Sequence, residues 1–359
     1  MKLLPIITFI IIQYLLITSS ATPIIKTPTS LSILETSNVI YEEIYKDDKL
    51  DYLVIGDWGF QGKGVGQKHG NQKNVAFVMK KWAERYNSQF IINVGDSFYK
   101  SEKDDHQGVD SVDDEKWKVA WLDVYKGRLA EIPWYSVAGN HDWYNNVTAE
   151  IDYSLNVNSR FFMPSLFYVR TSIFGNEEKT KVAWIHIDTN LFFYEYDWIQ
   201  NDGMKNNFNT LGWDNNKEVE MKLRWIEQQL IEQQDANWIF VAGHHPLIGT
   251  CATYYYMPKL IELFESYGVS GYFAGHAHVL EYKSPKPNSP VAYFTSGAAS
   301  RTSDGCGGKD WGMPEGTFGF LHATITANEM TFSFVNATTT KDKVVYQGKL
   351  TARSIWNPK

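Results

Sequence analysis

The stretch "FIINVGDSFY", Phe90 to Tyr99, decides the fold of this 359-residue chain. Four of its first five residues are apolar, as expected for a strand that is covered on both faces of a sheet. The chain then turns through Gly95 to Asp96, and Tyr99 follows three residues later. The stretch therefore predicts a buried strand whose end places an acid and a phenol at one corner of the fold.

This organisation recurs from residue 51 onward, as an apolar strand, a short polar loop and an amphipathic helix. Strands are predicted at residues 52–56, 90–95, 134–139, 182–188, 238–243, 271–275 and 291–297. Helices are predicted, from apolar residues at helical spacing, around residues 75–86, 117–124 and 219–230. The tail, residues 317–350, alternates and predicts antiparallel strands that close the fold. We expect one α/β domain.

The composition limits the partners that the chain can have. Hydrophobic residues make up 43% of the chain and aromatic residues 15%, which supports a large core and excludes disorder. The net charge is −7, and no run of Lys or Arg offers a basic face. We therefore expect no nucleic-acid partner.

The N-terminal residues 1–21 are typical of a signal peptide. Lys2 precedes the apolar run "LLPIITFIIIQYLLI", and small residues follow it up to Ala21. A retained membrane anchor is the alternative, but the run is short for a span and lacks a basic stop-transfer flank. We expect cleavage and no stable membrane anchor, then a lead-in or propeptide at 22–48 and a single domain at 49–359.

Two further features fit a secretory route. Asn146 and Asn336 each begin an N-glycosylation sequon. The chain has two cysteines, Cys251 and Cys306, which would most simply form one disulfide bond in an oxidising compartment. Two free, buried thiols are the alternative.

Chemically active side chains gather where the predicted strands end. These residues are Asp57, Asp96, Tyr99, Asn140, His141, Asp142, His244, His245, His276 and His278. Ligands of α/β folds bind beyond the carboxyl ends of the strands. The glycine that precedes each group lets backbone and side chains crowd around one centre. The sequence therefore predicts one site built from five strand ends.

Each motif alone has a structural explanation, whereas the set together predicts metal. A Gly-Asp pair is usually a turn, and buried histidines are commonly just hydrogen-bonded. His276 and His278 are stronger evidence, because residues two apart in extended chain project to the same side. Carboxylates, a phenol, an amide and imidazoles in one cluster are costly unless cations compensate them. A pair of metal ions would do so, and mixed O and N ligands favour Fe, Mn or Zn.

The ordered motifs resemble those of the purple acid phosphatases. They are Asp-x-Gly, Gly-Asp-x-x-Tyr, Gly-Asn-His-Asp, Val-x-x-His and Gly-His-x-His. Chain length, leader and motif spacing resemble the small, mammalian-type (tartrate-resistant, type 5) branch, and so does the sequon at Asn146. The resemblance spans residues 50–350. It implies a calcineurin-like metallophosphoesterase fold, in which two mixed β-sheets pack as a sandwich flanked by helices.

The resemblance also implies a ligand set for two adjacent metal ions that share Asp96. Asp57, Tyr99 and His278 would complete the protein ligands of Fe(III). Asn140, His244 and His276 would hold a divalent ion, which is Fe(II), Zn or Mn. Asp96 and Tyr99 then lie on one turn so that the carboxylate bridges and the phenolate colours the ferric ion.

The implied activity is that of an acid phosphatase. Metal-activated hydroxide would hydrolyse phosphate monoesters at acid pH. His141 is the candidate proton donor or phosphoryl ligand, with a purely structural hydrogen bond as the alternative, and Asp142 would orient it. We expect a monomeric glycoprotein, either secreted or in the lysosomal or endosomal lumen, that acts on phosphomonoester substrates.

The chain also departs from the mammalian-type pattern. Those enzymes carry a second active-site histidine at the position of Thr253, and His245 is not an assured replacement for it. They also have a cysteine after the strand that matches 182–188, and this chain has none there. Residues 201–215 occupy the place of a cleavable, repressive segment, and their Asn- and Gly-rich composition predicts an exposed loop.

Two rival functions stay open. Other metallophosphoesterases, which cleave phosphodiesters or nucleotides, share the Asp, Asn and His ligands but often lack the tyrosine at the position of Tyr99. The second rival is a secreted iron-binding glycoprotein with reduced catalysis, which the missing second histidine favours.

Overall fold

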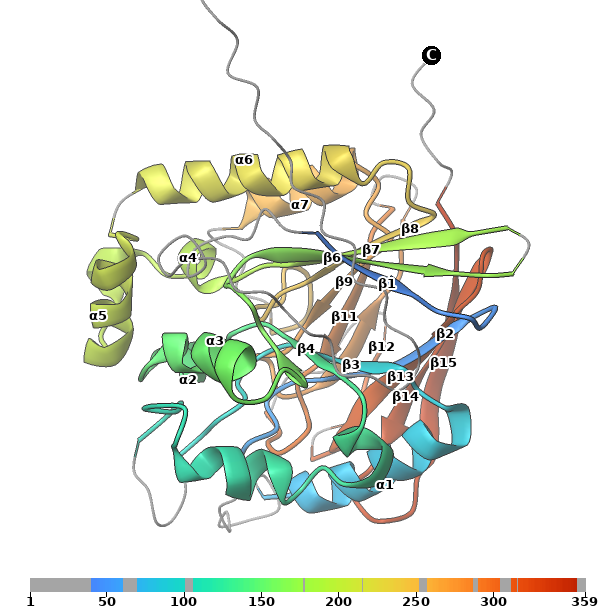
Figure 1. Ribbon diagram of the computed structural model, residues 1–359, viewed down its shortest axis with the longest axis horizontal. Helices are drawn as coiled ribbons and strands as arrows, with labels where there is room; N and C mark the ends of the chain where they lie inside the picture. Colours follow the sequence, from blue (N-terminus) through green and yellow to red (C-terminus); the bar gives the residue numbers. More distant parts are fainter. Residues whose placement is uncertain are drawn as a thin grey trace, which may run out of the picture.

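The computed structural model describes most of the chain and shows two β-sheets with helices on their outer sides (Figure 1). The described residues are 40–60, 70–100, 106–176, 178–214, 216–251, 257–286, 290–303, 311–314 and 316–353. Residues 1–39, which include the predicted signal peptide, lie outside them. No helix of the described part is both long and apolar enough to cross a membrane.

Both sheets are mixed. The eight-stranded sheet has the order β1 (Ile40–Ile44), β6 (Tyr168–Phe174), β7 (Thr180–His186), β8 (Trp238–Ala242), β9 (Gly271–Ala274), β11 (Ala292–Ser296), β10 (Leu280–Lys283) and β12 (Trp311–Gly312). The seven-stranded sheet has the order β15 (Lys343–Thr351), β14 (Glu329–Asn336), β13 (Gly319–Ile325), β2 (Leu50–Ile55), β3 (Phe90–Asn93), β4 (Trp134–Ser136) and β5 (Phe161–Phe162).

The strands that carry the predicted site run parallel. In the seven-stranded sheet β2 pairs with β3, and β3 with β4, in parallel. In the eight-stranded sheet β7, β8 and β9 are parallel neighbours. Because parallel strands end at the same edge, each sheet brings the loops of its own strands together.

The two sheets pack face to face through aromatic side chains. The ring of Tyr52, on β2, lies 5.2 Å edge-on from that of Trp184, on β7. Phe90 and Trp184 meet at 5.3 Å, and Phe294 meets Phe332 at 4.9 Å. Such edge-to-face pairs are the favoured geometry of aromatic cores. The sandwich confirms the fold class that the sequence predicted.

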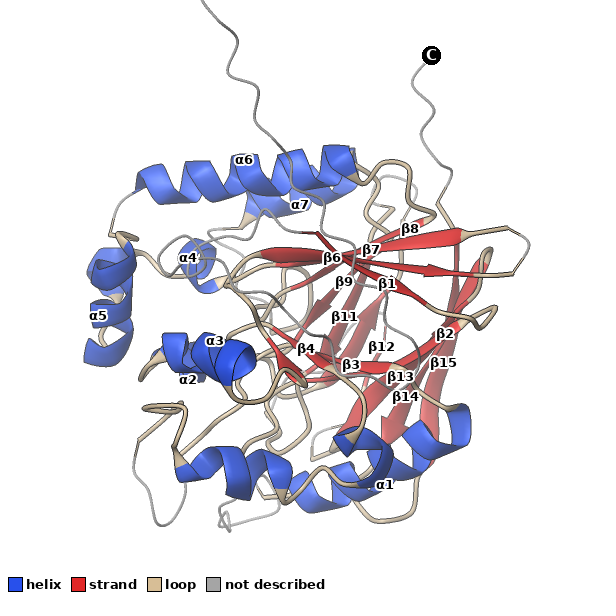
Figure 2. Ribbon diagram, in the orientation of Figure 1, coloured by secondary structure: helices blue, strands red, loops and turns tan. Residues whose placement is uncertain are grey.

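Helices cover the outer faces of the sandwich (Figure 2). They are α1 (Gln72–Tyr86), α2 (Asn140–Trp143), α3 (Val147–Asn156), α4 (Asn190–Phe193), α5 (Asp202–Leu211), α6 (Asn216–Glu232) and α7 (Pro258–Ser266), with a short π-helix, η1 (Trp117–Leu122), and two 3-10 helices, η2 (Gly127–Ala130) and η3 (Tyr196–Trp198). Figure 1 places α6 and α7 above the eight-stranded sheet and α1 below the other. Helices α2, α3 and α5 lie together at one end of the sandwich.

Helix α1 shows how the sequence builds these elements. Val75, Met79 and Trp82 are buried and recur at helical spacing, so one face of the helix packs on the sheet. The helix ends where Asn87 adopts a left-handed conformation, with φ 54°. Asn tolerates that conformation better than most residues, so it is a natural terminator.

The strand predictions are confirmed, but the N-terminal boundary of the domain is corrected. Residues 40–48 were assigned to the lead-in, whereas the structure includes them in the fold. Strand β1 pairs in parallel with β6 along its whole length, from Ile40 opposite Val169 to Ile44 opposite Ile173. The domain therefore begins by residue 40.

Strand β1 is attached through a buried ion pair. Arg170, on β6, is fully buried and its Nη1 lies 3.1 Å from the Glu43 carboxylate on β1. The guanidinium also stacks on Tyr135, 3.7 Å from the ring centroid, and on Phe90 at 4.3 Å. A charge buried this deeply depends on its partner, because the interior cannot solvate it.

We expect Glu43→Ala to destabilise the protein by about 3–5 kcal/mol, because it leaves the buried Arg170 charge uncompensated. Urea unfolding measures the loss. Glu42→Ala, on the same strand, is the matched control and should change stability by less than about 0.5 kcal/mol. Equal effects of the two substitutions would contradict the proposed attachment of β1.

The segment 201–215 is also corrected, from an exposed loop to a docked helix. The Asn201 side chain caps α5 by accepting a hydrogen bond from the Met204 N–H at 2.9 Å, and Gly212 ends the helix with φ 70°. Met204, Phe208 and Leu211 are buried. Asn215 lies outside the described residues. Whether the segment is cleaved in the native protein remains a prediction.

Candidate metal centre

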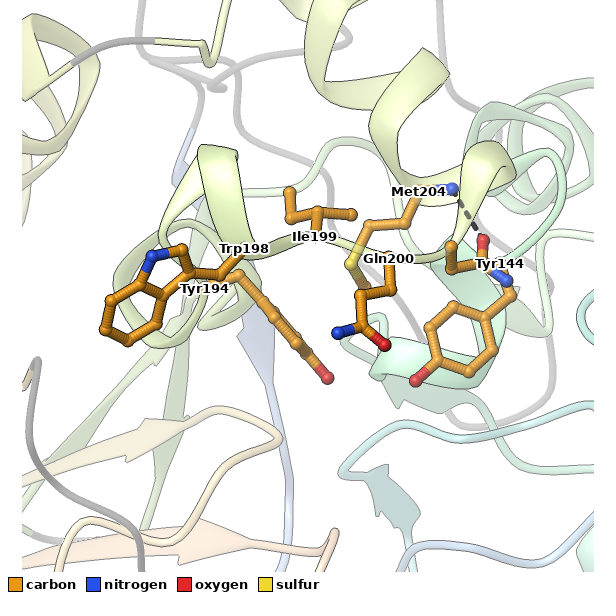
Figure 3. A pocket seen from close by; sticks show the side chains of 7 residues that line it. Tyr144, Tyr194, Trp198, Ile199, Gln200 and Met204 are labelled. Carbon is orange, nitrogen blue, oxygen red and sulfur yellow. Dashed lines mark hydrogen bonds between the residues drawn. The ribbon is translucent and has the colours of Figure 1, made fainter.

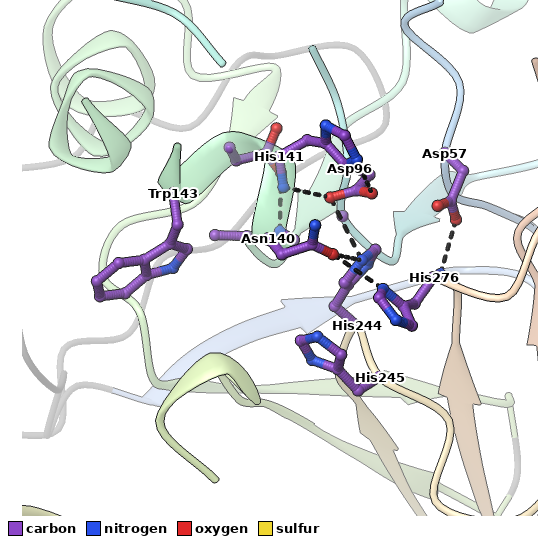
Figure 4. A network of polar contacts seen from close by, with 12 residues as sticks. Asp57, Asp96, Asn140, His141, Trp143, His244, His245 and His276 are labelled. Carbon is purple, nitrogen blue, oxygen red and sulfur yellow. Dashed lines mark hydrogen bonds and ion pairs between the residues drawn. The ribbon is translucent and has the colours of Figure 1, made fainter. Parts of the chain in front are cut away.

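The predicted ligands converge in one cluster. Figure 4 shows Asp57, Asp96, Asn140, His244 and His276 facing one another. Asp57 follows β2, Asp96 and Tyr99 follow β3, Asn140 and His141 begin α2 after β4, His244 follows β8, and His276 and His278 follow β9. Each sheet therefore contributes part of the cluster, which neither sheet could build alone.

The first half of the cluster surrounds the Tyr99 phenol. Its hydroxyl oxygen lies 3.0 Å from Asp57 Oδ1, 2.8 Å from Asp96 Oδ2 and 3.4 Å from His278 Nε2. His278 Nε2 is also 3.3 Å from Asp57 Oδ1. These are the side chains that the sequence assigned to Fe(III).

The second half surrounds the Asn140 amide oxygen. That oxygen lies 2.9 Å from His276 Nδ1 and 3.2 Å from His244 Nε2. His244 Nε2 is also 3.3 Å from Asp96 Oδ1, whose other oxygen faces Tyr99. The carboxylate of Asp96 thus lies between the two halves, as a bridging ligand must.

The donor set fits cations because its lone pairs outnumber its protons. His244 Nδ1 donates to the Val94 carbonyl at 2.7 Å, so the neutral ring presents a lone pair at Nε2. That lone pair faces the Asp96 and Asn140 oxygens, which are also acceptors. Tyr99 has one proton but faces two carboxylates. Converging acceptors of O and N type are what a pair of Fe, Zn or Mn ions requires.

The pKa values of the two carboxylates in the cluster are shifted in opposite directions. Burial raises the pKa of Asp57, and the neighbouring Asp96 adds to the rise. Burial would also raise the pKa of Asp96, but the imidazoles of His244 and His141 outweigh it and hold that pKa well below its usual range. Burial, Asp57 and Asp96 together raise the pKa of Tyr99 well above its usual value. Bound cations would stabilise the ionised forms of both carboxylates and of the phenol.

The pKa values of the imidazoles of His244 and His276 are also shifted in opposite directions. Burial alone would lower the pKa of His244, but Asp96 outweighs it and raises the pKa to about 9. Burial, followed by the charge of His244, lowers the pKa of His276 to about 3. His244 therefore binds a proton readily whereas His276 stays neutral, and shifts this large in a buried cluster are typical of a functional site.

The backbone is strained at the ligand positions. Among the described residues, four that are not glycine have positive φ, and three of them are Asp57 (58°), Asp96 (52°) and His276 (62°). This conformation is uncommon for residues with a side chain, and its cost persists where the surroundings impose it. The strain turns each ligand out of its strand and towards the centre.

Two glycines allow the loops to approach each other. Gly95 has φ 90°, and a Cβ there would lie 2.8 Å from His244 Nδ1. A Cβ on Gly139 would lie 2.2 Å from Asp96 Oδ1. No larger side chain fits at either position without displacing a predicted ligand.

His141 lies beside the centre and is partly open to solvent. Its side chain is 17% exposed, whereas that of His244 is fully buried. Its Nδ1 is 2.8 Å from Gln107 Oε1, which can only accept, so Nε2 carries the free lone pair. Nε2 is 3.9 Å from Asp96 Oδ2. Burial, reinforced by Arg301 and partly offset by Asp96, lowers the pKa of His141 to about 4.

Asp142 has a different role from the one predicted. Its carboxylate accepts hydrogen bonds from the N–H groups of Ser97 and Phe98, at 2.9 and 3.2 Å, and of Gly139 at 2.8 Å. It therefore ties the turn that carries Asp96 to the start of α2. Gln107, and not Asp142, holds the His141 ring.

Arg301 is a cation that the motifs did not predict. Its guanidinium carbon lies 5.0 Å from the Tyr99 ring centroid and 5.5 Å from that of Phe60. No carboxylate of the described residues pairs with it, and its buried Nε has no hydrogen-bond partner. Its charge lowers the pKa of His141 and opposes the rise at Tyr99. A positive charge that no carboxylate of the described residues neutralises thus lies beside the Tyr99 ring.

Tyr144 is a second residue that the motifs missed. Its hydroxyl accepts a hydrogen bond from Asn140 Nδ2 at 3.0 Å, which turns the Asn140 amide oxygen towards the histidines. The spacing of four residues within one helical turn is the signal that could have predicted this contact. Gln107 and Arg301 lie in loops, and no spacing in the sequence predicts that they approach the cluster.

His245 is buried and does not face the mouth of the site. Its Nδ1 is 2.8 Å from Thr189 Oγ1, and its ring stacks on Phe193 at 3.9 Å. Burial, followed by the charges of His276 and His244, holds its pKa well below the usual value. Its Nε2 has no hydrogen-bond partner among the described residues, and its ring lies close enough to His244 and His276 to hold an ion with them. Thr253, the expected position of the missing histidine, lies outside the described residues.

A separate cluster of His106, Asp110 and Asp114 could also hold an ion by its spacing. Its side chains lie in a surface loop, and His106 Nε2 is 3.0 Å from Asp114 Oδ2. Internal hydrogen bonds satisfy this cluster, including that from the Asp110 N–H to Asp114 at 3.0 Å. It lacks the surplus of lone pairs found at the strand ends.

The modification sites are only partly described. Asn146 and Asn336 are half-buried at the surface, and the Asn146 amide oxygen accepts a hydrogen bond from the Thr148 hydroxyl of its sequon at 2.7 Å. Glycosylation itself stays a prediction. Cys251 is disulfide-bonded. Its predicted partner, Cys306, lies outside the described residues.

Comparison with known proteins identifies the family. The pattern of the calcineurin-like phosphoesterases matches residues 50–280, and the chain belongs to this family. Purple acid phosphatase 17 of Arabidopsis thaliana is 30% identical over 264 residues, which cover 72% of this chain and 71% of the relative. Tartrate-resistant acid phosphatase type 5 of Oryctolagus cuniculus is 28% identical over 323 residues, covering 84% and 92%. Within the family, the chain is thus a relative of the purple acid phosphatases, as its motifs predicted.

Solved structures support the fold. GAP50, the anchor in the inner membrane complex of Plasmodium, superposes with a TM-score of 0.69 at 22% identity, covering 85% of this chain and 90% of that one. A purple acid phosphatase from yellow lupin seeds gives a TM-score of 0.54 at 13% identity, covering 86% and 54%. Identities this low establish the architecture, and function has to be argued from the site.

Proposed function

We propose that this protein is an acid phosphatase that hydrolyses phosphate monoesters at acid pH with a dinuclear Fe(III)–M(II) centre, in which M is Fe, Zn or Mn. The observation that carries the proposal is the Tyr99 phenol, which lies 3.0 and 2.8 Å from the carboxylates of Asp57 and Asp96. The phenolate form of such a residue is stabilised when its oxygen binds a cation, and a trivalent ion stabilises it more than a divalent one. The relationship to purple acid phosphatases supports the same assignment.

The residues divide into two ligand sets. The ferric ion would be held by Asp57, Asp96, Tyr99 and His278, and the divalent ion by Asp96, Asn140, His244 and His276. When bound, the ions would neutralise charge on the phosphoryl oxygens and make water nucleophilic at acid pH.

His141 would donate a proton to the leaving group. Attack of the nucleophilic oxygen forms a new bond to phosphorus, the bond from phosphorus to the ester oxygen breaks, and that oxygen leaves as the alcohol once it gains a proton. Nε2 is the atom that would carry this proton, because Nδ1 is hydrogen-bonded to Gln107. The His141 side chain is 17% exposed, so a substrate could reach part of the ring.

Arg301 would hold the phosphoryl oxygens in place of the absent second histidine. Its guanidinium has no carboxylate partner among the described residues and lies over the Tyr99 ring. Arg is well matched to phosphate, because its planar fork can donate two parallel hydrogen bonds. The electrostatic field of this residue already reaches His141, on whose pKa it acts.

We expect Arg301→Ala to lower kcat/KM for a phosphate monoester by about tenfold and to weaken inhibition by inorganic phosphate, because a charge-assisted hydrogen bond contributes about 1.5–3 kcal/mol. Arg301→Lys should retain part of the affinity, and added guanidinium should restore part of the activity of Arg301→Ala. Arg85→Ala is the control, since Arg85 also stacks on an aromatic ring, Trp82, but on α1. Unchanged phosphate inhibition in Arg301→Ala would refute the role.

The activity is tested by comparing p-nitrophenyl phosphate with its bis-ester across the acid range. The monoester should be clearly preferred, and a preference for the bis-ester would favour a phosphodiesterase instead. Metal analysis and a visible spectrum of the same preparation test the cofactor. Iron together with a phenolate absorption band is expected, whereas a colourless, iron-free and active protein would exclude the ferric assignment.

We base the proposed cellular compartment on the sequence. The leader, the sequons at Asn146 and Asn336 and the bonded Cys251 support a glycoprotein in a secreted or lysosomal compartment. Such a compartment would provide the acid pH that the proposed chemistry uses.

A further inference from the structure

His245 is a fully buried histidine that the proposed reaction does not use. Its Nε2 atom is buried, and no group in the described part of the chain forms a hydrogen bond with it. Nearly all buried polar atoms of native proteins have a partner, so an atom without one calls for an explanation, such as an ion that binds there. The position of the ring indicates which ion this would be.

The other contacts of His245 hold its ring in place. Nδ1 lies 2.8 Å from the hydroxyl oxygen of Thr189, and a hydroxyl group can donate or accept, so this contact suits either tautomer of the ring. The His245 N–H also donates to Thr189 Oγ1 at 3.0 Å, and the Tyr272 hydroxyl donates to the His245 carbonyl at 2.8 Å. Phe193 stacks on the ring at 3.9 Å. Nε2 is therefore a fixed atom that is left available to a ligand.

The His245 ring lies beside two predicted ligands of the divalent ion (Figure 4). Its centroid is 4.5 Å from that of His276 and 5.0 Å from that of His244. One ring nitrogen of each of the three histidines lies within 4.8 Å of the others. Two nitrogens bound to one ion at about 2.1 Å each are at most about 4.2 Å apart, so the nitrogens need to approach each other by only about 0.6 Å. One ion can therefore bind all three imidazoles.

The structure also provides an approach to these histidines, which a metal site requires. A pocket of about 450 Å³ lies beside them (Figure 3). Tyr144 lines it and is hydrogen-bonded to the predicted ligand Asn140 at 3.0 Å. Tyr194 also lines it, and its ring is 5.8 Å from that of His245. None of the residues that line the pocket is charged, so none of them would retain a cation on its way to the histidines.

We propose that His245 Nε2 is a further ligand of the divalent ion, which would then be held by three imidazoles, those of His244, His245 and His276. The proposal rests on the proposed function, because it assumes the dinuclear centre, and it adds a ligand that the motifs did not predict. Imidazole ligands suit zinc, whereas manganese is better matched by oxygen ligands. The third imidazole should therefore make the site select Zn(II) over Mn(II).

The test measures the binding of Zn(II) and of Mn(II) to the full-length protein after a chelator has removed the divalent ion. His245→Phe keeps a flat ring against Phe193 but has no ring nitrogen. It should weaken Zn(II) binding by at least about tenfold, and Mn(II) binding by less, so the preference for zinc should decrease. His186→Phe is the matched control and should change neither affinity. His186 is also fully buried, has an unpaired ring nitrogen and stacks on Tyr168 at 4.3 Å, but it is not among the predicted ligands.

Two further measurements distinguish a ligand from a residue that only supports the ligands. In His245→Ala, added imidazole should occupy the space of the missing ring and restore Zn(II) binding, whereas it should have no effect on His245→Phe. With Co(II) in the divalent position, each bound imidazole contributes one strongly shifted, exchangeable N–H signal to the proton NMR spectrum. His245→Phe should show one signal fewer than the wild type.

The proposal would be overturned by an equal number of shifted signals in the wild type and His245→Phe, by an unchanged Zn(II) affinity, or by a failure of imidazole to restore Zn(II) binding to His245→Ala. Each of these results would leave the phosphatase with the ligands that the motifs predict. A wild type that binds no divalent ion would overturn both proposals. If the wild type binds Zn(II) but does not hydrolyse p-nitrophenyl phosphate, the proposed function fails, and the affinities and the signal count still decide the role of His245.

Discussion

We expect Asp96→Asn to lose most of the activity and also to lose one of the two metal ions. The carboxylate lies between the two halves of the cluster, with one oxygen near Tyr99 and the other near His244. A neutral amide cannot bridge two cations. Because the ions supply several kcal/mol of transition-state stabilisation, turnover should fall by at least about 10³-fold.

Asparagine is the informative replacement because it preserves the local backbone. Asp96 has φ 52°, a conformation that Asn tolerates. Its Oδ1 also accepts a hydrogen bond from the His141 N–H at 2.8 Å, which an amide oxygen can maintain. Metal content and turnover are measured together. Asp110→Asn, in the other acidic cluster, is the control, and a loss of metal there instead would move the centre to the surface loop.

His141→Ala is expected to lower kcat by about 10²–10⁴-fold, the usual contribution of a positioned acid or base. Metal content and the visible band should not change, because the ring is not among the predicted ligands. Gln107→Ala should have a smaller effect of the same kind, since Gln107 only holds Nδ1. His322→Gln, at a histidine paired with Asp51 in the seven-stranded sheet, is the control. If His141→Ala also lost metal, the ring would be a ligand and not the proton carrier.

The strands of the site could be predicted because they are covered on both faces. Such strands are unbroken apolar runs, and the glycine after each run marks where it ends. Strand β1 could not be found in this way. Its Glu43 makes "IYEEI" resemble a surface segment, and the charged partner that compensates this buried acid is Arg170, 127 residues further along the chain.

Helix α5 could have been predicted from the sequence. Met204, Phe208 and Leu211 recur at helical spacing, and Asn201 and Gly212 are good end signals. The composition of the segment, rich in Asn and Gly, led to the prediction of an exposed loop. Here the periodicity should have taken precedence over the composition, because three buried apolar residues suffice to dock a short helix.

The sequence predicted which side chains the structure brings together as candidate ligands, but it did not predict their surroundings. The ligands follow strands whose order in space is set by the fold, so short motifs locate them. Gln107 and Arg301 lie beside the centre on connecting segments, whose paths depend on packing that no local pattern records. The sequence could therefore predict the proposed reaction centre, whereas the group that would hold the phosphoryl oxygens required the structure.

The left-handed residues Asp57, Asp96 and His276 give the site an evolutionary signature. In a descendant that no longer needed catalysis, selection for ligands would cease while the strain remained. Glycine or asparagine would then spread first at these three positions, because both relax the backbone. A sequence in which glycine occupies these positions, with the rest of the sandwich intact, would thus record a lineage that kept the scaffold and abandoned the chemistry.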